Sequence, residues 1–146
     1  MRISRQHMFM EMAHVVAKRA TCFRLNVGAL LVVRNRIVGM GYNGQAPGED
    51  HCKSMCAPGM CNTTHAEINC LIHAADTKNL GDLYCTDSPC AECAWRIVES
   101  GRVDRVFYDR PYRDLSPTHL LSSQGVKVYR VLHAGIVDIE GNQVCL

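Results

Sequence analysis

The sequence has few aromatic side chains, no long apolar run and almost no excess of either charge. Aromatic residues make up 6% of the 146 residues, and the apolar run over 27–33 falls far short of the roughly 20 residues that a membrane-spanning helix needs. The 16 Lys and Arg residues against 14 Asp and Glu residues leave a formal net charge of +2, which argues against a strongly basic nucleic-acid-binding protein. The polar N-terminal residues lead into no secretory apolar segment. We therefore expect a soluble, cytoplasmic protein that binds neither nucleic acid nor membrane.

The chain also lacks internal repeats, low-complexity tracts and any linker that would separate two domains. With 47% hydrophobic residues, we expect residues 1–146 to form one domain with its own core. Helical spacing and capping residues predict helices over 4–20, 64–75, 89–100 and 116–123. Runs rich in Val, Ile and Leu predict strands over 25–33, 36–41, 83–86, 103–108 and 126–132. The alternation of helices with strands indicates an α/β protein with parallel pairing in the second half of its sheet.

Turn residues mark several of these boundaries. Arg34 and Asn35 separate the first two strands, which indicates an antiparallel hairpin. Gly101 follows the third predicted helix in the position of a C-cap. Residues 43–62 are rich in Gly, Pro and Cys, which is typical of a loop, and residues from 134 onward show no clear pattern.

Cysteine, by contrast, is abundant. The nine cysteines are an odd number, so a disulfide framework cannot account for all of them. Without a secretion signal, metal ligation or catalysis explains them better than disulfides. Zinc takes imidazole nitrogen and thiolate sulfur, and three protein ligands leave its fourth position for water.

Two predicted helix starts carry such ligands: His65 with Glu67 on one, and Cys90 with Cys93, preceded by Pro89, on the other. The two cysteines lie on one side of a first helical turn, where the helix dipole favours thiolates. His65, Cys90 and Cys93 are therefore the candidate zinc ligands. Glu67 reaches the open position without occupying it, and H-x-E followed by P-C-x-x-C is the signature of zinc nucleobase deaminases.

Structural interpretations of the same residues stay open. Thr64 and Glu67 also fit a capping box, in which each caps the other's backbone at the start of a helix. A lone Cys-x-x-Cys fits a redox pair or half of a structural zinc site.

Beyond this signature, the chain closely resembles the deoxycytidylate (dCMP) deaminase family within the cytidine deaminase superfamily. The resemblance covers most of residues 3–130 and is carried by the segments 19–22 (RATC), 27–29 (VGA), 41–44 (GYNG), 65–69 (HAEIN), 88–94 (SPCAECA) and 100–101 (SG). It implies a three-layer α/β/α cytidine deaminase-like fold with a mixed five-stranded sheet. It also implies zinc-dependent hydrolytic deamination of dCMP to dUMP and ammonia, a step in pyrimidine deoxynucleotide metabolism.

The family reaction assigns roles around the base. Glu67 would take a proton from water activated by the zinc, deliver it to N3 of cytosine and then protonate the departing amino group. The Ala66 backbone amide would hold the base carbonyl, and the Ser88 carbonyl would hold the amino group.

Other substrate contacts also follow from the resemblance. Asn43 matches the position that contacts the sugar in related deaminases. Arg24 and Asn26 lie where the family places groups near the 5′-phosphate, a ligand that suits arginine. Tyr112 matches a tyrosine that borders the substrate. Each of the three residues also has a structural alternative. Asn43 would be a turn residue, Arg24 a solvated surface charge and Tyr112 part of ordinary loop packing.

Regulation and assembly are implied by the resemblance alone. In this family the glycine-rich loop contributes to a regulatory triphosphate site at a subunit interface, often within a hexamer. Here that loop contains Gly41, Tyr42, Gly44, Pro47 and Gly48. Backbone amides of such a loop can approach phosphates closely, although an ordinary loop is the alternative. The implied partners are dCTP and dTTP as effectors, Mg²⁺ carried with the triphosphate, and further copies of the chain in a homo-oligomer.

A second, structural zinc is predicted in the cysteine-rich loop. Cys52, Cys56 and Cys61 crowd this loop, and Cys22 resembles the family position that joins it in a metal site. Four thiolates would close a tetrahedral shell and leave no place for water. His51 is the alternative ligand, and free thiols are the alternative state. The remaining cysteines are assigned to packing as small buried hydrophobic side chains: Cys70, Cys85 and Cys145.

Two further functions stay open. A deaminase of another base, such as cytidine or a tRNA adenosine, would keep the same zinc triad, although an RNA-acting enzyme is expected to present a basic face. A non-catalytic zinc-binding module is the other alternative. Glu67 separates this module from an enzyme, because a structural site fills its fourth position with Cys or His and needs no carboxylate.

Overall fold

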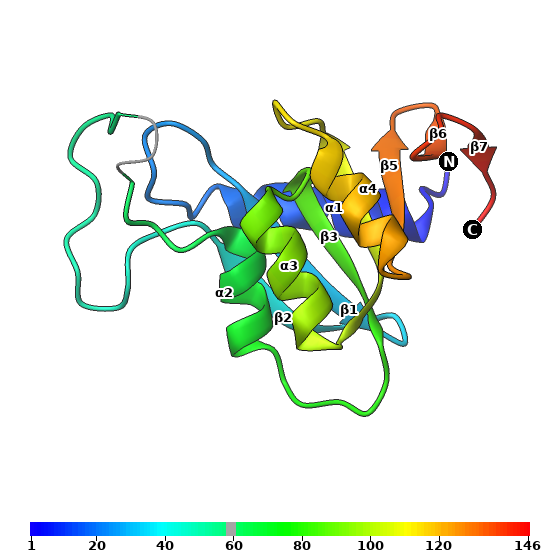
Figure 1. Cartoon of the computed structure of the whole chain (residues 1–146), viewed down its shortest axis with the longest axis horizontal. Coiled ribbons are helices and arrows are strands. Elements are labelled where there is room, and N and C mark those ends of the chain that lie inside the picture. The colour runs from blue at the N-terminus through cyan, green and yellow to red at the C-terminus, as the bar shows by residue number, and fades with distance from the viewer. Residues whose placement is uncertain (58–60) are drawn as a thin grey trace.

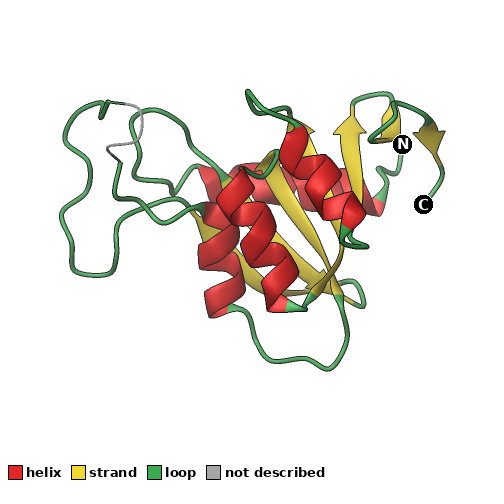
Figure 2. Cartoon of the chain, viewed as in Figure 1, coloured by secondary structure: helices red, strands yellow, loops and turns green. Residues whose placement is uncertain are grey.

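A mixed sheet with helices on both faces makes up the computed structural model, which describes residues 1–57 and 61–146 (Figures 1 and 2). Its strand order is β2-β1-β3-β4-β5-β6-β7. The strands are β1 (Gly28–Val33), β2 (Arg36–Tyr42), β3 (Gly81–Asp87), β4 (Val103–Arg110), β5 (Lys127–Leu132), β6 (Gly135–Asp138) and β7 (Gln143–Val144). The helices are α1 (Arg5–Ala17), α2 (Ala66–His73), α3 (Ala91–Ser100) and α4 (Ser116–Ser123). In the part of the chain that is described, no helix has the length and apolarity to cross a membrane.

Helix α1 begins where the sequence predicts. The Ser4 hydroxyl accepts a hydrogen bond from the His7 amide at 3.2 Å, which makes Ser4 the N-cap. The helix ends at Ala17 rather than at residue 20. Beyond it the Lys18 and Arg19 amides donate to carbonyls only three residues back. The segment predicted as the last turn of the α-helix therefore forms tighter turns with i to i+3 hydrogen bonds.

The predicted hairpin and the parallel strands are confirmed. Arg34 and Asn35 have positive φ angles of 49° and 61°, the backbone that a two-residue hairpin turn requires. Strands β1 and β2 pair antiparallel on either side of this turn. Strand β3 pairs parallel with β4, and β4 pairs parallel with β5. The sheet is therefore mixed, as the resemblance implies.

Each face of the sheet has its own apolar core. On one face Phe9 of α1 packs on Tyr84, whose ring stacks on Phe107 with the centroids 4.7 Å apart. On the other face Leu83 and Val106 form part of the core under α2, α3 and α4. Neighbouring residues of β3 and β4 thus point to opposite faces, as the period of two requires. This arrangement confirms the three-layer α/β/α fold.

The expected number of strands is wrong: the sheet has seven strands rather than five. The two additional strands, β6 and β7, lie in the tail that shows no clear sequence pattern. Gly135, at φ 151°, begins β6, and Ile136 is buried against Val131 of β5. Strands of four and two residues are too short to show an alternating pattern, so tertiary pairing creates them.

Helix α2 packs very close to strand β2. A Cβ atom built on Gly41 would lie 2.5 Å from the Ala66 carbonyl oxygen, and one on Gly39 would lie 2.6 Å from the Ala74 Cβ. Larger side chains at these positions would push the helix off the sheet. The two glycines therefore set the position of α2, the helix that His65 precedes.

Candidate active site

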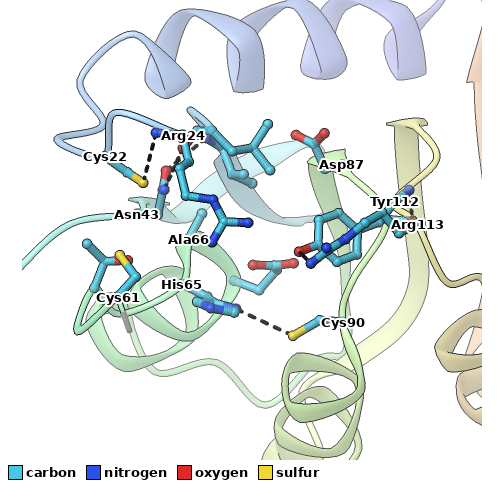
Figure 3. A pocket seen from close by; sticks show the side chains of 15 residues that line it. Cys22, Arg24, Asn43, Cys61, His65, Ala66, Asp87, Cys90, Tyr112 and Arg113 are labelled. Carbon is cyan, nitrogen blue, oxygen red and sulfur yellow. Dashed lines mark hydrogen bonds between the residues drawn. The ribbon is translucent and has the colours of Figure 1, made fainter. Parts of the chain in front are cut away.

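The candidate zinc ligands meet at the starts of two neighbouring helices. His65 is the N-cap of α2 and Cys90 is the N-cap of α3, while Cys93 lies in the first turn of α3. The His65 Nδ1 atom lies 3.2 Å from the Cys93 sulfur and 3.4 Å from the Cys90 sulfur. All three donor atoms lie within 4.8 Å of one another. Figure 3 shows His65 and Cys90 facing each other across the mouths of the two helices.

This donor set fits a zinc ion. With Zn–N near 2.0–2.1 Å and Zn–S near 2.3 Å, a tetrahedral site separates its nitrogen and sulfur ligands by about 3.6 Å. The two nitrogen–sulfur distances in the structure come within a few tenths of an ångström of that spacing. One imidazole and two thiols are also ligand types that zinc takes readily.

The electrostatics of the cluster favour one thiolate beside one imidazolium. A hydrogen bond with the Cys93 side chain, together with His65, lowers the pKa of Cys90 to about 4. The bond to Cys90 raises the pKa of His65 to about 9. The pKa of Cys93 is raised by its bond to Cys90 and by burial. A divalent cation would reverse this balance for His65 and Cys93, because both must lose a proton to bind it.

Glu67 lies beside this cluster in the first turn of α2. Its side chain is buried, with 4% of the residue exposed, and burial raises the pKa of its carboxyl group. The capping-box interpretation is wrong, because α2 is capped by His65 without a side-chain bond. Thr64 instead pairs its backbone with Gly44 through N–O distances of 2.8 and 3.2 Å. The Thr64 amide that the capping box would assign to Glu67 is therefore bonded to Gly44.

A pocket of about 330 Å³ opens over Glu67 and the cluster (Figure 3), within the range of roughly 300–1,000 Å³ that is typical of small-ligand sites. Most of the predicted substrate contacts line it: Arg24, Asn43, Ala66, Ser88 and Tyr112. Asn26 is not among its lining residues. The Asn26 carbonyl accepts a hydrogen bond from Arg110 at 3.2 Å, which holds the segment 24–27, whose other three residues line the pocket.

Two charged residues that line the pocket, Arg113 and Asp87, were not predicted from the sequence. Arg113 stacks over the Tyr112 ring at 5.2 Å and donates to its hydroxyl at 3.1 Å. Figure 3 shows Arg24 and Arg113 entering the pocket from different segments of the chain. Asp87 is the last residue of β3 and lies just before Ser88. Their positions directly beside Tyr112 and Ser88 are the signal in the sequence that points to them.

Asn43 uses its amide group to hold the pocket wall. Its Oδ1 accepts from the Val27 amide at 2.8 Å, and its Nδ2 donates to the Leu25 carbonyl at 2.7 Å. The residue is 7% exposed. Since it also lines the pocket, Asn43 combines a structural role with the predicted position beside the substrate.

Three of the predicted ligands of the second metal site lie together. The sulfurs of Cys52, Cys56 and Cys61 lie within 4.8 Å of one another. The described ligand group does not include Cys22, whose sulfur accepts a bond from the Arg24 amide at 3.4 Å. His51 is exposed and also lies outside this group.

The other three cysteines divide between core and surface. Cys70 and Cys85 are fully buried, which confirms their assignment to packing, and burial raises the pKa of Cys70 to about 12. Cys145 is exposed, so its assignment to the core is wrong. It follows the two-residue strand β7, where only Val144 packs against the core.

The residues predicted for a regulatory site are partly covered by other elements and partly exposed. Gly41 is covered by α2, and the Tyr42 carbonyl accepts from the Asn69 side chain at 2.9 Å. Gly44 pairs with Thr64 as described above. Pro47 and Gly48 are exposed in the following turn, where Gly48 has a φ of 89°. Of the five predicted residues, only Pro47 and Gly48 are exposed to solvent.

Comparisons with known proteins agree with this geometry. Residues 3–109 match the family described as "Cytidine and deoxycytidylate deaminase zinc-binding region". The chain is 33% identical to the ComE operon protein 2 of Bacillus subtilis over 97% of its own length and 79% of that protein. It is 33% identical to the deoxycytidylate deaminase of Schizosaccharomyces pombe over 82% of its length, but spans only 42% of that longer protein. The crystal structure of the dCMP deaminase from cyanophage S-TIM5 in complex with dCMP and dUMP superposes with a TM-score of 0.78 at 28% identity, over 89% of this chain and 98% of that one.

The fold and the cluster at the two helix starts thus define a hydrolytic deaminase of the cytidine deaminase superfamily. More narrowly, the chain belongs to the cytidine and deoxycytidylate deaminase family.

The structural role of Asn43 leads to a stability prediction. We expect Asn43→Ala to lower the free energy of unfolding by about 2–4 kcal/mol, because the buried Val27 amide and Leu25 carbonyl lose their partner. Urea denaturation measures this change, with the exposed Asn62→Ala as the control. Wild-type stability in Asn43→Ala would contradict the structural role and leave only a contact with substrate.

Proposed function

We propose that this chain catalyses the zinc-dependent hydrolytic deamination of dCMP to dUMP and ammonia. The observation that carries the proposal is a buried carboxyl, Glu67, beside the His65–Cys90–Cys93 cluster in a pocket that two arginines enter. Support for dCMP comes from relatives with the name deoxycytidylate deaminase and from the similar cyanophage enzyme, which was crystallised with dCMP and dUMP.

His65, Cys90 and Cys93 would hold the zinc ion at the floor of the pocket. When bound, zinc supplies Lewis acidity that brings the pKa of water close to ~7. The three residues leave one tetrahedral position without a protein ligand. This position is the one that distinguishes a hydrolytic site from a structural zinc site.

Glu67 is the group that moves protons. Burial raises the pKa of its carboxyl, so the group holds a proton more readily than an exposed glutamate does. It takes a proton from water as the hydroxide adds to C4, and passes this proton to N3 of the cytosine ring. It then takes the proton of the new C4 hydroxyl and delivers it to the amino group, which leaves as ammonia while the C4 carbonyl forms. One carboxyl group serves as base and acid in turn.

Backbone groups near Glu67 would hold the base, and the arginines would hold the phosphate. Ala66 and Ser88 are buried at 0% and 3% exposure, so hydrogen bonds to the base from their backbones would be shielded from water. Arg24 and Arg113 are exposed at the pocket mouth, and guanidinium groups suit a phosphate dianion. Arg113 is added to the predicted phosphate contacts because it lines the pocket, whereas Asn26 is not among the lining residues.

A comparison of substrates tests the proposed function. We expect ammonia release to be fastest with dCMP among dCMP, dCTP, deoxycytidine, cytidine and a tRNA hairpin with a target adenosine. Glu67→Gln is the matched variant: it should keep its zinc, measured by elemental analysis, and lose roughly 10²–10⁴-fold in turnover. Faster reaction of another substrate would shift the function to that base. A tenth or more of wild-type activity in Glu67→Gln would show that it is not the proton carrier.

We also propose that dCTP and dTTP, carried with Mg²⁺, regulate the enzyme within a homo-oligomer, with a hexamer as the expected assembly. The exposed turn at Pro47 and Gly48 is the part of the predicted loop that is open to a phosphate. We expect sigmoidal saturation by dCMP that changes when dCTP or dTTP is added. Hyperbolic curves that neither nucleotide changes, in a chain that sediments as a monomer, would contradict regulation and assembly together.

A second zinc ion in the cysteine-rich loop is also proposed. The close sulfurs of Cys52, Cys56 and Cys61 support it, and Cys22 or His51 would supply the fourth ligand. We expect two zinc ions per chain in the wild type and one in Cys52→Ser. Cys145→Ser, at an exposed cysteine outside both clusters, should keep two and is the control. One zinc ion in a fully active wild-type chain would rule the second site out.

A further inference from the structure

The pocket wall formed by residues 24–27 has no regular secondary structure and is held by side chains from other strands. Asn43, just after β2, binds the Leu25 carbonyl and the Val27 amide. The Asn26 carbonyl and the Gly28 amide, which flank Val27, are held from β3 and β4 instead. The wall carries Arg24 and ends where β1 begins.

One ion pair joins the bonds from β3 and β4. The Arg110 Nη2 atom donates to the Asp87 carboxylate at 2.8 Å and to the Asn26 carbonyl at 3.2 Å. The same carboxylate oxygen accepts from the Thr86 hydroxyl at 2.8 Å, and that hydroxyl oxygen accepts from the Gly28 amide at 3.2 Å. The side chain of Asp87 is 10% exposed. A continuous chain of bonds therefore runs from Asn26 through the ion pair to Gly28.

The pair also controls the charge of the pocket. Asp87 lines the pocket, where an unpaired carboxylate would repel a phosphate dianion. Arg110 neutralises this carboxylate without lining the pocket itself. Its guanidinium thus acts on a ligand only through Asp87 and the wall.

We propose that Arg110, paired with Asp87, is a positioning residue that holds the 24–27 wall and sets the affinity for the 5′-phosphate of the nucleotide. The inference rests on the proposed function, because it takes a nucleotide monophosphate as the ligand. Arg110 is not among the residues that line the pocket, and its described bonds go to Asp87 and Asn26, so we expect its effect to fall on binding and not on proton transfer.

The same two strands provide a matched control. Asp82 and Arg105 pair across β3 and β4 just as Asp87 and Arg110 do, five residues nearer the start of each strand. Arg105 makes two bonds of 2.7 Å to Asp82, and neither residue lines the pocket. Arg105→Met therefore removes an ion pair from the same sheet and leaves the wall in place.

Steady-state kinetics with the zinc-loaded enzyme test the inference. We expect Arg110→Met to raise KM for dCMP about tenfold and to change kcat less than about twofold. Inhibition by dUMP should weaken by a similar factor, whereas inhibition by deoxyuridine, which lacks the phosphate, should change less than about twofold. Arg105→Met should keep the wild-type KM even where its thermal midpoint falls.

A second substitution separates the repulsion from the loss of wall contacts. Asp87→Asn keeps an acceptor for Thr86 and removes the negative charge, so Arg110→Met/Asp87→Asn should recover part of the lost affinity, to a KM about threefold above wild type. The two changes would then be non-additive, as expected for residues in contact.

Arg110→Lys provides the test if the methionine variant does not fold. Lysine keeps the charge but cannot reproduce the planar guanidinium contacts, so this variant should give an intermediate KM.

Three results would overturn the inference: a wild-type KM in the folded Arg110 variants, an equal rise of KM in Arg105→Met, or a loss confined to kcat. Equal weakening of dUMP and deoxyuridine would also overturn it, because the effect would then not involve the phosphate. Failure of the wild-type chain to deaminate dCMP would instead contradict the proposed function.

Discussion

The close packing of helix α2 on strand β2 is the constraint on which the site depends. Gly39 and Gly41 leave the facing side of the strand bare, so the helix backbone approaches it directly. At the other end of the helix, Arg102 donates to the carbonyls of Leu71, Ala74 and Ala75, which otherwise lack partners at a helix C-terminus. Because α2 has only eight residues, a tilt at either end would move His65 and Glu67 away from the cysteines of α3.

The pocket contains acidic groups in its interior and basic groups at its mouth. Glu67 is buried at its floor, and burial raises the pKa of this carboxyl. Asp87 is paired with Arg110, while Arg24 and Arg113 are exposed at the mouth. Among the described residues that line the pocket, the carboxyl groups are thus either buried or paired with an arginine, and Arg24 and Arg113 place positive charge at the mouth. Exposed positive charge at the rim of a pocket attracts anionic ligands, which agrees with the proposed nucleotide substrate.

Short-range patterns predict much of this molecule. The hairpin at Arg34 and Asn35, the cap at Ser4 and the cap at Gly101 depend on a few neighbouring residues, so their prediction needs no knowledge of the fold. The assembly of His65 with Cys90 and Cys93 is also predictable, because each ligand marks a helix start and zinc chemistry limits their arrangement. Strands β6 and β7 were not predictable, since the pairing of β6 with β5 and of β7 with β6 supplies the stability that four- and two-residue segments lack.

The sequence by itself determines the chemistry of this protein: which residue types can hold a metal, which carboxyl accompanies them and which helices begin with them. Only the tertiary structure decides which polar groups share a wall. Asn43 follows β2, Asp87 ends β3 and Arg110 ends β4, and these residues meet around the segment 24–27, where Arg110 donates to the Asn26 carbonyl. The surface position of Cys145 is decided in the same way, by a last strand of only two residues. The spacing of residues along the chain predicts local structure. Contacts between strands depend instead on the register in which distant segments pair, and one segment alone does not determine that register.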